Sequence, residues 1–278
     1  MPAKKTNKPT FDETSCRHIL SLSGGKDSTA LALYMRERVS KMEYVFCDTE
    51  KELQETYEYL EKLEAYLGCK IKRITPDVSF DDLLEKRGNF LPSPQIRWCT
   101  ENLKIKPFEK FIGDDPVIMY IGIRADEQHR KGYISTKPNI QPRFPFIEDG
   151  LKLQDIIRIL EDSQLGLPEY YKWRSRSGCY FCFFQQRREW VGLLETHPNL
   201  FQKAMKYERQ DRATGEFYTW VQGESLAELA QPARISQIKI EYEKRKAAQS
   251  NVLKDGSLLS VFKMQCSDEN SGCIICHL

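Results

Sequence analysis

The sequence has little excess charge and no long hydrophobic run. Its 278 residues include 42 Lys and Arg against 40 Asp and Glu, a formal net charge of +2. Such a molecule does not attract nucleic acid over its whole surface, so any affinity of that kind must come from a local patch. No run approaches the roughly 18 apolar residues that a membrane span requires. We therefore expect a cytoplasmic protein with no membrane partner.

Two widespread phosphate-binding motifs are also missing at the first pair of glycines. Neither the Walker A pattern nor the dinucleotide pattern G-x-G-x-x-G occurs there. Residues 23–29 read SGGKDST instead, between an apolar run and a helix-like stretch. A strand that breaks at paired glycines and enters a helix leaves several backbone N–H groups around one small concavity, with the positive end of the helix behind them. The segment therefore predicts a cradle for the pyrophosphate of a nucleotide.

Side chains of the same segment add to the predicted cradle. Lys26 supplies a mobile positive charge, and the hydroxyls of Ser23, Ser28 and Thr29 supply further donors. The alternative is an ordinary glycine-rich turn that Ser28 caps.

Apolar runs alternate with helical patterns along the first half of the chain. The predicted strands span residues 18–22, 43–47, 70–74 and 117–123. Strands that alternate with helices indicate a parallel sheet with helices on both faces. We therefore predict an α/β fold with a Rossmann-like parallel sheet.

Polar clusters follow three of these strands, where nucleotides bind such sheets. The clusters are residues 23–29 and the segments that begin at Asp48 and Arg124. Asp48 and Thr49 are expected near the adenosine, and Arg124 near the phosphates. The residues expected to bind the nucleotide are Ser21, Ser23, Gly24, Gly25, Lys26, Asp27, Ser28, Thr29, Asp48, Thr49, Gly122 and Arg124. Those expected to act in catalysis are Lys26, Asp27 and Arg124.

The character of the chain changes near residue 145, after which helical patterns dominate. Two of the predicted helices span residues 151–162 and 199–210. We predict a nucleotide-binding domain over residues 1–145 and a helical, cysteine-rich substrate or metal-cluster region over residues 146–278.

Nine cysteines are unevenly spread along the chain. Cys16, Cys47 and Cys69 stand singly at or beside predicted strands, where a small apolar core residue is the expected role. The other six form two C-x-x-C pairs and two single positions: Cys99, Cys179, Cys182, Cys266, Cys273 and Cys276. In a reducing compartment such pairs indicate metal ligation more often than disulfides.

Several of these segments together resemble one known group of enzymes. The loop SGGKDS resembles the PP-loop of ATP pyrophosphatases. The segments around Asp48, Cys99, Gly122 and Cys179 are similar to the phosphoadenosine phosphosulfate reductase-like branch of that superfamily, over about residues 15–205. The resemblance implies an adenine nucleotide alpha hydrolase fold and cleavage of ATP between its α and β phosphates. The loop would hold the β and γ phosphates, which Mg²⁺ would bridge.

Within that branch, cysteines placed like Cys99, Cys179 and Cys182 often bind a 4Fe–4S cluster, so the resemblance implies such a cluster here. These clusters usually take four thiolates, and the fourth ligand is open. The candidates for it are Cys266, Cys273 and Cys276. Zinc accepts the same thiolates and stays an alternative. Cys273 and Cys276 could instead carry sulfur as a mobile pair, or belong to an uncoordinated tail.

The set of motifs resembles the PP-loop component of bacterial DNA phosphorothioation systems. This resemblance implies an enzyme that converts ATP to AMP and pyrophosphate and so activates an acceptor, DNA, for sulfur insertion. It also implies a cysteine desulfurase as sulfur donor and other phosphorothioation subunits as partners. The alternatives are a sulfonucleotide reductase, a tRNA thiolation enzyme and a protein that binds ATP without turnover. The complete loop, with Lys26 and Asp27, favours intact ATP as the ligand.

Between residues 170 and 190, basic side chains alternate with aromatic ones. The basic residues are Lys172, Arg174, Arg176, Arg187 and Arg188. Positive charge for phosphates together with rings for bases is typical of a nucleic-acid groove. The alternative is that the rings shield a cluster from water and the arginines donate to its sulfurs or to the nucleotide.

Overall fold

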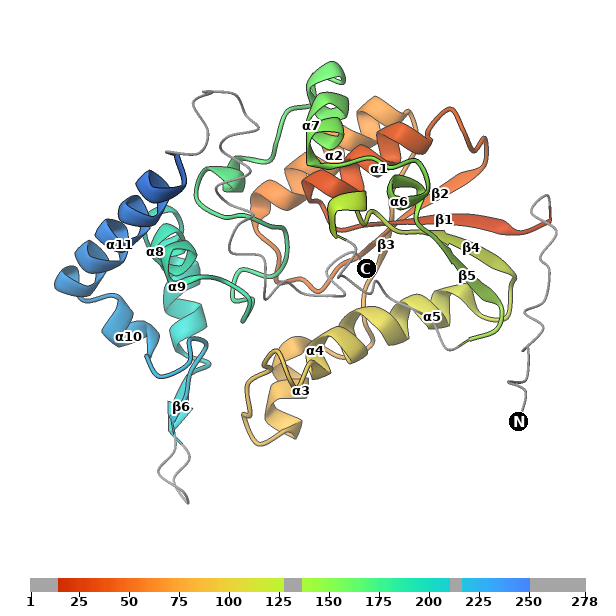
Figure 1. Ribbon diagram of the computed structural model, residues 1–278. Helices are drawn as coiled ribbons and strands as arrows, with labels where there is room; N and C mark the ends of the chain where they lie inside the picture. Colours follow the sequence, from red (N-terminus) through yellow and green to blue (C-terminus); the bar gives the residue numbers. More distant parts are fainter. Residues whose placement is uncertain (1–14, 128–136, 211–216, 251–278) are drawn as a thin grey trace, which may run out of the picture.

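Five parallel strands form the central sheet of the protein (Figure 1). The computed structural model describes residues 15–127, 137–210 and 217–250. In chain order the strands are β1 (Arg17–Leu22), β2 (Met42–Cys47), β3 (Lys72–Ile74), β4 (Val117–Tyr120) and β5 (Ile140–Arg143). Their order across the sheet is β3-β2-β1-β4-β5. The order reverses between β1 and β4, and ligands of doubly wound sheets bind at such a switch point. The predicted α/β fold is confirmed.

Helices cover both faces of this sheet (Figure 1). On one face, α1 (Lys26–Met35), α2 (Gln54–Leu67) and α7 (Leu153–Asp162) bury apolar side chains against alternate residues of β1, among them Leu20 and Leu22. On the other face, α5 (Lys106–Ile112) packs Phe108 and Ile112 against the opposite set of strand residues. The central strands β1, β2 and β4 are largely apolar because both sides of the sheet are covered, whereas the edge strands β3 and β5 carry polar residues.

The remaining elements are mostly short helices, helical turns and one hairpin. They are α3 (Phe80–Lys86), α4 (Trp98–Thr100), a π-helical turn (Glu101–Ile105), α6 (Pro145–Glu148), two 3₁₀ turns (Ala125–Glu127 and Glu169–Lys172), α8 (Arg187–Thr196), α9 (Pro198–Met205), the hairpin strands β6 (Arg209–Gln210) and β7 (Phe217–Tyr218), α10 (Leu226–Leu229) and α11 (Pro232–Ser250). No helix in the described part of the chain has both the length and the apolar character that crossing a membrane demands.

All four predicted strands are present, although β3 begins only at Lys72 and β4 ends already at Tyr120, and β5 was missed. Gln141, Pro142 and Arg143 interrupt its apolar pattern, and a proline is tolerated because β5 lies at the edge of the sheet. The helix predicted over residues 199–210 is wrong at its carboxyl end. It stops at Met205, and the chain turns into the hairpin that begins at Arg209.

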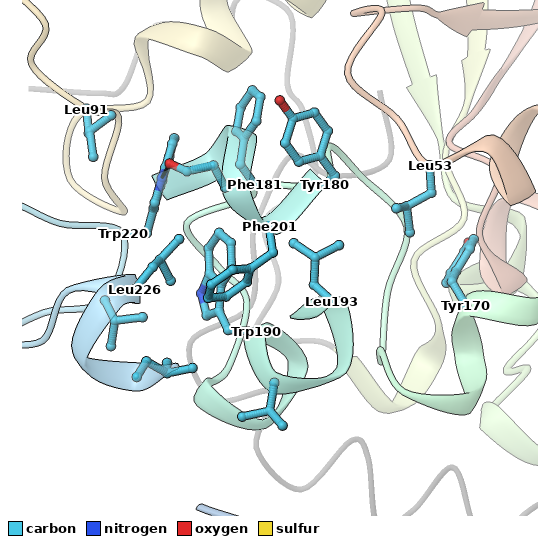
Figure 2. Close-up of a cluster of buried hydrophobic side chains, with 14 of the residues drawn as sticks. Leu53, Leu91, Tyr170, Tyr180, Phe181, Trp190, Leu193, Phe201, Trp220 and Leu226 are labelled. Atoms are coloured by element: carbon cyan, nitrogen blue, oxygen red, sulfur yellow. Dashed lines mark hydrogen bonds between the residues drawn. The ribbon is translucent and has the colours of Figure 1, made fainter. Parts of the chain in front are cut away.

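A second hydrophobic core lies between α3 and the helices α8 to α10 (Figure 2). Trp190, Phe201 and Trp220 are its large buried side chains, with Phe181 stacked on Trp220 at 5.1 Å between ring centroids. Tyr170 and Phe181 belong to the aromatic stretch that the sequence offered as a nucleic-acid groove. Because these rings are buried, their role is packing, and the nucleic-acid interpretation is wrong for them.

The predicted domain boundary at residue 145 stays a prediction. Phe146, Ile156 and Leu160, which lie beyond it, pack in the same core as Leu20 of β1. The helices that cover the sheet therefore include at least part of residues 146–278, the predicted helical region.

A candidate nucleotide site beside three cysteines

The glycine loop lies at the switch point, between the end of β1 and the start of α1, and two neighbours pack closely against it. Gly24 has a φ of +71°, and a Cβ there would lie 2.6 Å from Thr56 Cγ2 of α2. A Cβ on Gly25 would lie 2.8 Å from Ser177 Oγ. The positive φ favours glycine at position 24, and a side chain at either position would force Thr56 or Ser177 to shift, in addition to the close approach of phosphate that the sequence predicted.

Four buried charged side chains meet behind the loop. Lys26 Nζ lies 2.9 Å from Asp27 Oδ2, and Asp27 Oδ1 lies 3.0 Å from Arg124 Nη1. Arg124 also reaches Glu127 Oε1 at 3.4 Å and the half-exposed Asp126 at 3.0 Å. The side chains of Lys26, Asp27, Arg124 and Glu127 are each less than a tenth exposed. The structure thus brings the three predicted catalytic residues together, with Asp27 bridging the two cations.

This cluster carries no surplus of positive charge. Lys26 and Arg124 are offset by Asp27 and Glu127, so a polyphosphate placed here would bring negative charge that these four groups do not balance. Gly122 completes the arrangement, since a Cβ there would lie 3.1 Å from Asp27 O and hold β4 away from the loop.

Two hydroxyls of the predicted set are used differently from one another. Ser28 Oγ donates to Gly25 O at 3.1 Å and accepts from Ser23 N at 3.2 Å, which braces the loop internally. Ser21 Oγ is buried, and so is Thr56 Oγ1 nearby in the fold; neither has a hydrogen-bond partner among the described residues. Buried hydroxyls without a partner are uncommon in proteins and are typical of ligand sites.

The second half of the chain covers the loop. Tyr170 Oη donates to Gly24 O at 2.7 Å, and Lys26 N donates to Tyr171 Oη at 3.0 Å across 145 residues of sequence. Ser177 Oγ donates to Ser23 Oγ at 3.1 Å. Burial raises the pKa of both tyrosines well above its usual range, so both phenols are neutral. Sequence reasoning missed this cover, whose only signal was the aromatic stretch itself.

Asp48 and Thr49, both predicted near the adenosine, lie in different surroundings. Asp48 Oδ1 accepts from Tyr57 Oη at 2.8 Å and from the backbone of Glu50. Thr49 Oγ1 donates to Glu52 at 2.9 Å and lies 3.3 Å from Cys179 Sγ. Thr49 therefore belongs to the surroundings of the cysteines.

One cavity joins the cysteines to the loop. It is lined by Ser23, Thr49, Phe80, Pro92, Cys99, Thr100, Leu103, Lys104, Ser177, Gly178, Cys179, Phe181, Cys182, Phe183, Phe184 and Trp220. Three cysteines from two distant segments thus share a largely aromatic chamber with the first residue of the loop. Lys104, which also lines it, comes from the π-helical turn, a distortion frequent at functional sites.

Glu52 is a buried carboxyl that the sequence analysis did not single out. It accepts from Thr49 Oγ1 and the backbone of Lys51, and its Oε1 lies 3.8 Å from Cys179 Sγ. Desolvation by burial raises the pKa of Glu52, while the Lys104 charge opposes the shift. Its signal in the sequence was weak, because Glu52 is one of several acidic residues that follow the second strand.

The donor set suits a thiolate-bound centre only in part. Cys99, Cys179 and Cys182 are soft sulfur donors in one chamber, as iron–sulfur clusters and zinc require. Among the described residues, however, no three such side chains stand close enough to hold a metal ion as placed. Burial raises the pKa of Cys99 to about 12 and that of Cys179 further, so both thiols are neutral without a cation. The predicted ligands Cys273 and Cys276, and the candidate Cys266, lie outside the described residues.

Of the three single cysteines, Cys47 is buried and Cys16 half-buried. The core prediction is wrong for Cys69, which is exposed two residues after α2 ends at Leu67.

Arg174 supports the cysteine segment from inside. Its side chain is fully buried, and its guanidinium donates to Gly178 O at 3.0 Å and to Cys179 O at 2.9 Å. Arg174 is therefore no part of a nucleic-acid surface, which corrects the sequence-based interpretation of this residue.

Several known proteins are similar in sequence to parts of this chain. Two uncharacterized proteins of Methanocaldococcus jannaschii are 29% and 27% identical to it, over 70% and 66% of this chain and 42% and 45% of their own. The chain thus spans less than half the length of these two relatives. An uncharacterized nin region protein of Escherichia phage lambda is 26% identical over 63% of this chain and 68% of its own.

A solved structure and a family model match as well. The crystal structure of phosphoadenylyl-sulfate reductase from Candida auris, a phosphate complex, aligns with a TM-score of 0.44 at 16% identity, over 59% of this chain and 78% of that one. Residues 17–148 match the family model of the phosphoadenosine phosphosulfate reductase domain. That segment holds all five strands of the sheet, the glycine loop and Arg124. Residues 17–148 of this chain are therefore similar to phosphoadenosine phosphosulfate reductase domains.

Proposed function

We propose that the protein binds ATP at residues 23–29 and cleaves it between the α and β phosphates. The observation that supports this most is the buried trio of Lys26, Asp27 and Arg124 beside the closely packed Gly24 and Gly25. The trio lies at the switch point of the sheet, where nucleotides bind in folds of this kind.

In this proposal the loop and its two cations hold the β and γ phosphates. An acceptor oxygen attacks the α phosphorus, the bond from that phosphorus to the bridging oxygen breaks, and pyrophosphate leaves with the electron pair. The acceptor becomes adenylylated, and water as acceptor would give AMP. Lys26 and Arg124 stabilise the departing charge, while Asp27 orients both of them.

Mg²⁺ would supply the positive charge that the balanced cluster lacks, by neutralising phosphate oxygens. Asp27 and the half-exposed Asp126 are the carboxylates at the loop with the oxygen chemistry that Mg²⁺ prefers. The hydroxyl of Tyr171 now accepts from Lys26 N, so a phosphate oxygen that takes this N–H would displace the phenol.

The acceptor that we propose is a non-bridging oxygen of the DNA backbone. Adenylylation converts a poor leaving group into AMP, which sulfur can then replace. Ser23, the first residue of the loop, lines the cysteine chamber, so the chamber adjoins the loop. In that chamber Cys99, Cys179 and Cys182 would hold three positions of a 4Fe–4S cluster, with zinc as the alternative metal. A cysteine desulfurase would supply the sulfur, and other phosphorothioation subunits would act with this chain.

A sulfonucleotide reductase is the second candidate, because residues 17–148 match the domain named for that activity. Its substrate carries no β and γ phosphates, so the charged trio behind the loop would have no pyrophosphate to hold.

The products of ATP turnover test the proposal. With α-labelled ATP, Mg²⁺ and the full chain, together with duplex DNA and a cysteine desulfurase system, we expect labelled AMP and one pyrophosphate per AMP. Labelled ADP, or orthophosphate released directly, would refute cleavage at the α phosphorus. Sulfite released from a sulfonucleotide in the presence of a thiol reductant, with no pyrophosphate from ATP, would establish the reductase instead.

The cluster has a separate test in metal content. We expect the protein purified without oxygen to hold iron and to absorb broadly in the visible range. Cys179→Ser should lose most of both, because it removes a sulfur at the centre of the chamber. Cys69→Ser is the matched control, since that thiol is exposed and outside the chamber, and it should keep the iron. Stoichiometric zinc without iron, or equal iron content in both variants, would contradict the proposal of a 4Fe–4S cluster.

A further inference from the structure

A groove separate from the loop lies between the first turn of α8 and one side of α11. Four arginines line it, namely Arg187 and Arg188 from α8 and Arg234 and Arg245 from α11. Glu241 is the one acidic side chain among the lining residues, and Tyr242 contributes a ring. The groove therefore concentrates guanidinium groups from two helices on one concave surface.

The groove also stands out against the charge of the whole chain. The lining residues carry four arginines against the single carboxylate of Glu241. Four basic minus one acidic residue leave +3, more than the +2 of the entire sequence. This is the local patch that nucleic-acid affinity would require in a chain so nearly neutral.

The Arg188 side chain is held in place, and one of its guanidinium nitrogens has no hydrogen-bond acceptor among the described residues. Its guanidinium stacks over the Tyr242 ring, with Cζ 4.5 Å from the centroid, and its Nε donates to Gln186 Oε1 at 3.3 Å. Nη2 is buried and has no hydrogen-bond partner among the described residues. Glu189 Oε1, its nearest carboxylate oxygen at 3.9 Å, already accepts from the backbone and hydroxyl of Ser175 at 2.7 and 2.6 Å. Because Nη2 is buried, a ligand oxygen in the groove would reach it only after the guanidinium turns toward the groove.

Arg187 and Arg234 are fixed by a shared carboxylate behind the groove. Arg187 Nε lies 2.8 Å from one oxygen of Glu224, and Arg234 Nε lies 2.5 Å from the other. One carboxylate thus orients two guanidinium groups and neutralises only one of them. Arg245 is exposed at the next turns of α11. Planar, oriented guanidinium forks match the oxygens of phosphate better than lysines do.

We propose that this groove binds the phosphodiester backbone of a nucleic acid. The arginines would contact successive phosphates, and Tyr242 offers a ring against a sugar or base. Only the identity of the polymer as DNA rests on the proposed function. The groove is tied to the loop through α8, since Glu189 holds Ser175 and Ser177 donates to Ser23. A strand held here would therefore contact the element that braces the cover of the nucleotide site.

Binding of the full chain to labelled duplex DNA and to an RNA hairpin of equal phosphate number, without ATP, tests this proposal. The double change Arg188→Gln with Arg245→Gln should weaken binding by at least about tenfold near 100 mM salt, and reduce the slope of log affinity against log salt by about two. Arg158→Gln, an exposed arginine on α7, is the matched control and should bind as the parent does.

The single change Arg245→Gln controls for loss of binding through misfolding, because the Arg245 side chain is exposed. It should reduce the slope by about one with an unchanged melting temperature. Tighter binding of the duplex supports DNA, and tighter binding of the hairpin supports RNA. Three results would refute the proposal that the groove binds nucleic acid. They are unchanged binding in the double variant, an equal loss in Arg158→Gln, and equal competition by polyglutamate. None of these outcomes depends on ATP cleavage, which the product assay measures separately.

Discussion

Replacing Lys26 with alanine is expected to slow pyrophosphate release by a factor of about 10² to 10³, the usual cost of removing one donor that stabilises a developing charge. Lys26 is the loop's own cation, held 2.9 Å from Asp27, and in the proposed reaction it faces the leaving group. The measurement is the single-turnover rate of AMP formation at saturating ATP.

The fold should survive this change. Asp27 keeps its ion pair with Arg124 at 3.0 Å, so no buried carboxylate loses every cation. Lys41→Ala, at an exposed lysine after α1, is the matched control and should retain the parent rate. Metal content and melting temperature should be those of the parent. A rate within threefold of the parent would remove Lys26 from the reaction, and a joint loss of metal and stability would mean that the change acts through folding.

Replacing Arg174 with methionine is expected to lower the free energy of unfolding by roughly 2–5 kcal/mol, because two carbonyl groups lose charged donors in a partly buried site. Methionine retains much of the apolar contact, so the loss reports mainly on the hydrogen bonds to Gly178 O and Cys179 O. Urea denaturation of the purified protein measures it.

Two further variants complete the Arg174 experiment. Arg158→Met, on the exposed side of α7, should change stability by less than about 0.5 kcal/mol. Arg174→Lys should fall between methionine and the parent, because one ammonium keeps the charge but lacks the fork that spans both carbonyls. A loss below about 1 kcal/mol in Arg174→Met would show that the segment around Cys179 holds its shape without this residue.

The parts of the fold that the sequence predicted are those specified by local pattern. β1, β2 and β4 are apolar because both faces of the sheet are covered, and the glycine loop follows β1 directly. β5 escaped prediction because its contacts with β4 sustain a strand in which every residue after Ile140 is polar or proline. Pairing with a neighbour, rather than propensity, determines such an edge strand.

The residues of the candidate site also fall into those that local sequence patterns predicted and those that they did not. The loop and Arg124 were predicted because each follows a strand, and parallel strands bring their carboxyl ends together. Tyr171 and Ser177 were not, since nothing near them in the sequence indicates contact with residues 145 or more positions earlier. The aromatic stretch was ambiguous because alternating rings and basic residues suit a surface as well as a core. Burial decided against the surface for Tyr170 and Arg174.

The close packing of the glycine loop has a consequence for how this protein could be divided. Thr56 presses on Gly24 from within the family-matched segment, whereas Ser177 and Tyr171 meet Gly25 and Lys26 from beyond its end at residue 148. A fragment trimmed to the matched segment would keep every strand of the central sheet but would lose the side chains that cover one side of the loop. If the loop binds a nucleotide as proposed, a fragment that retains this binding should therefore extend beyond residue 148.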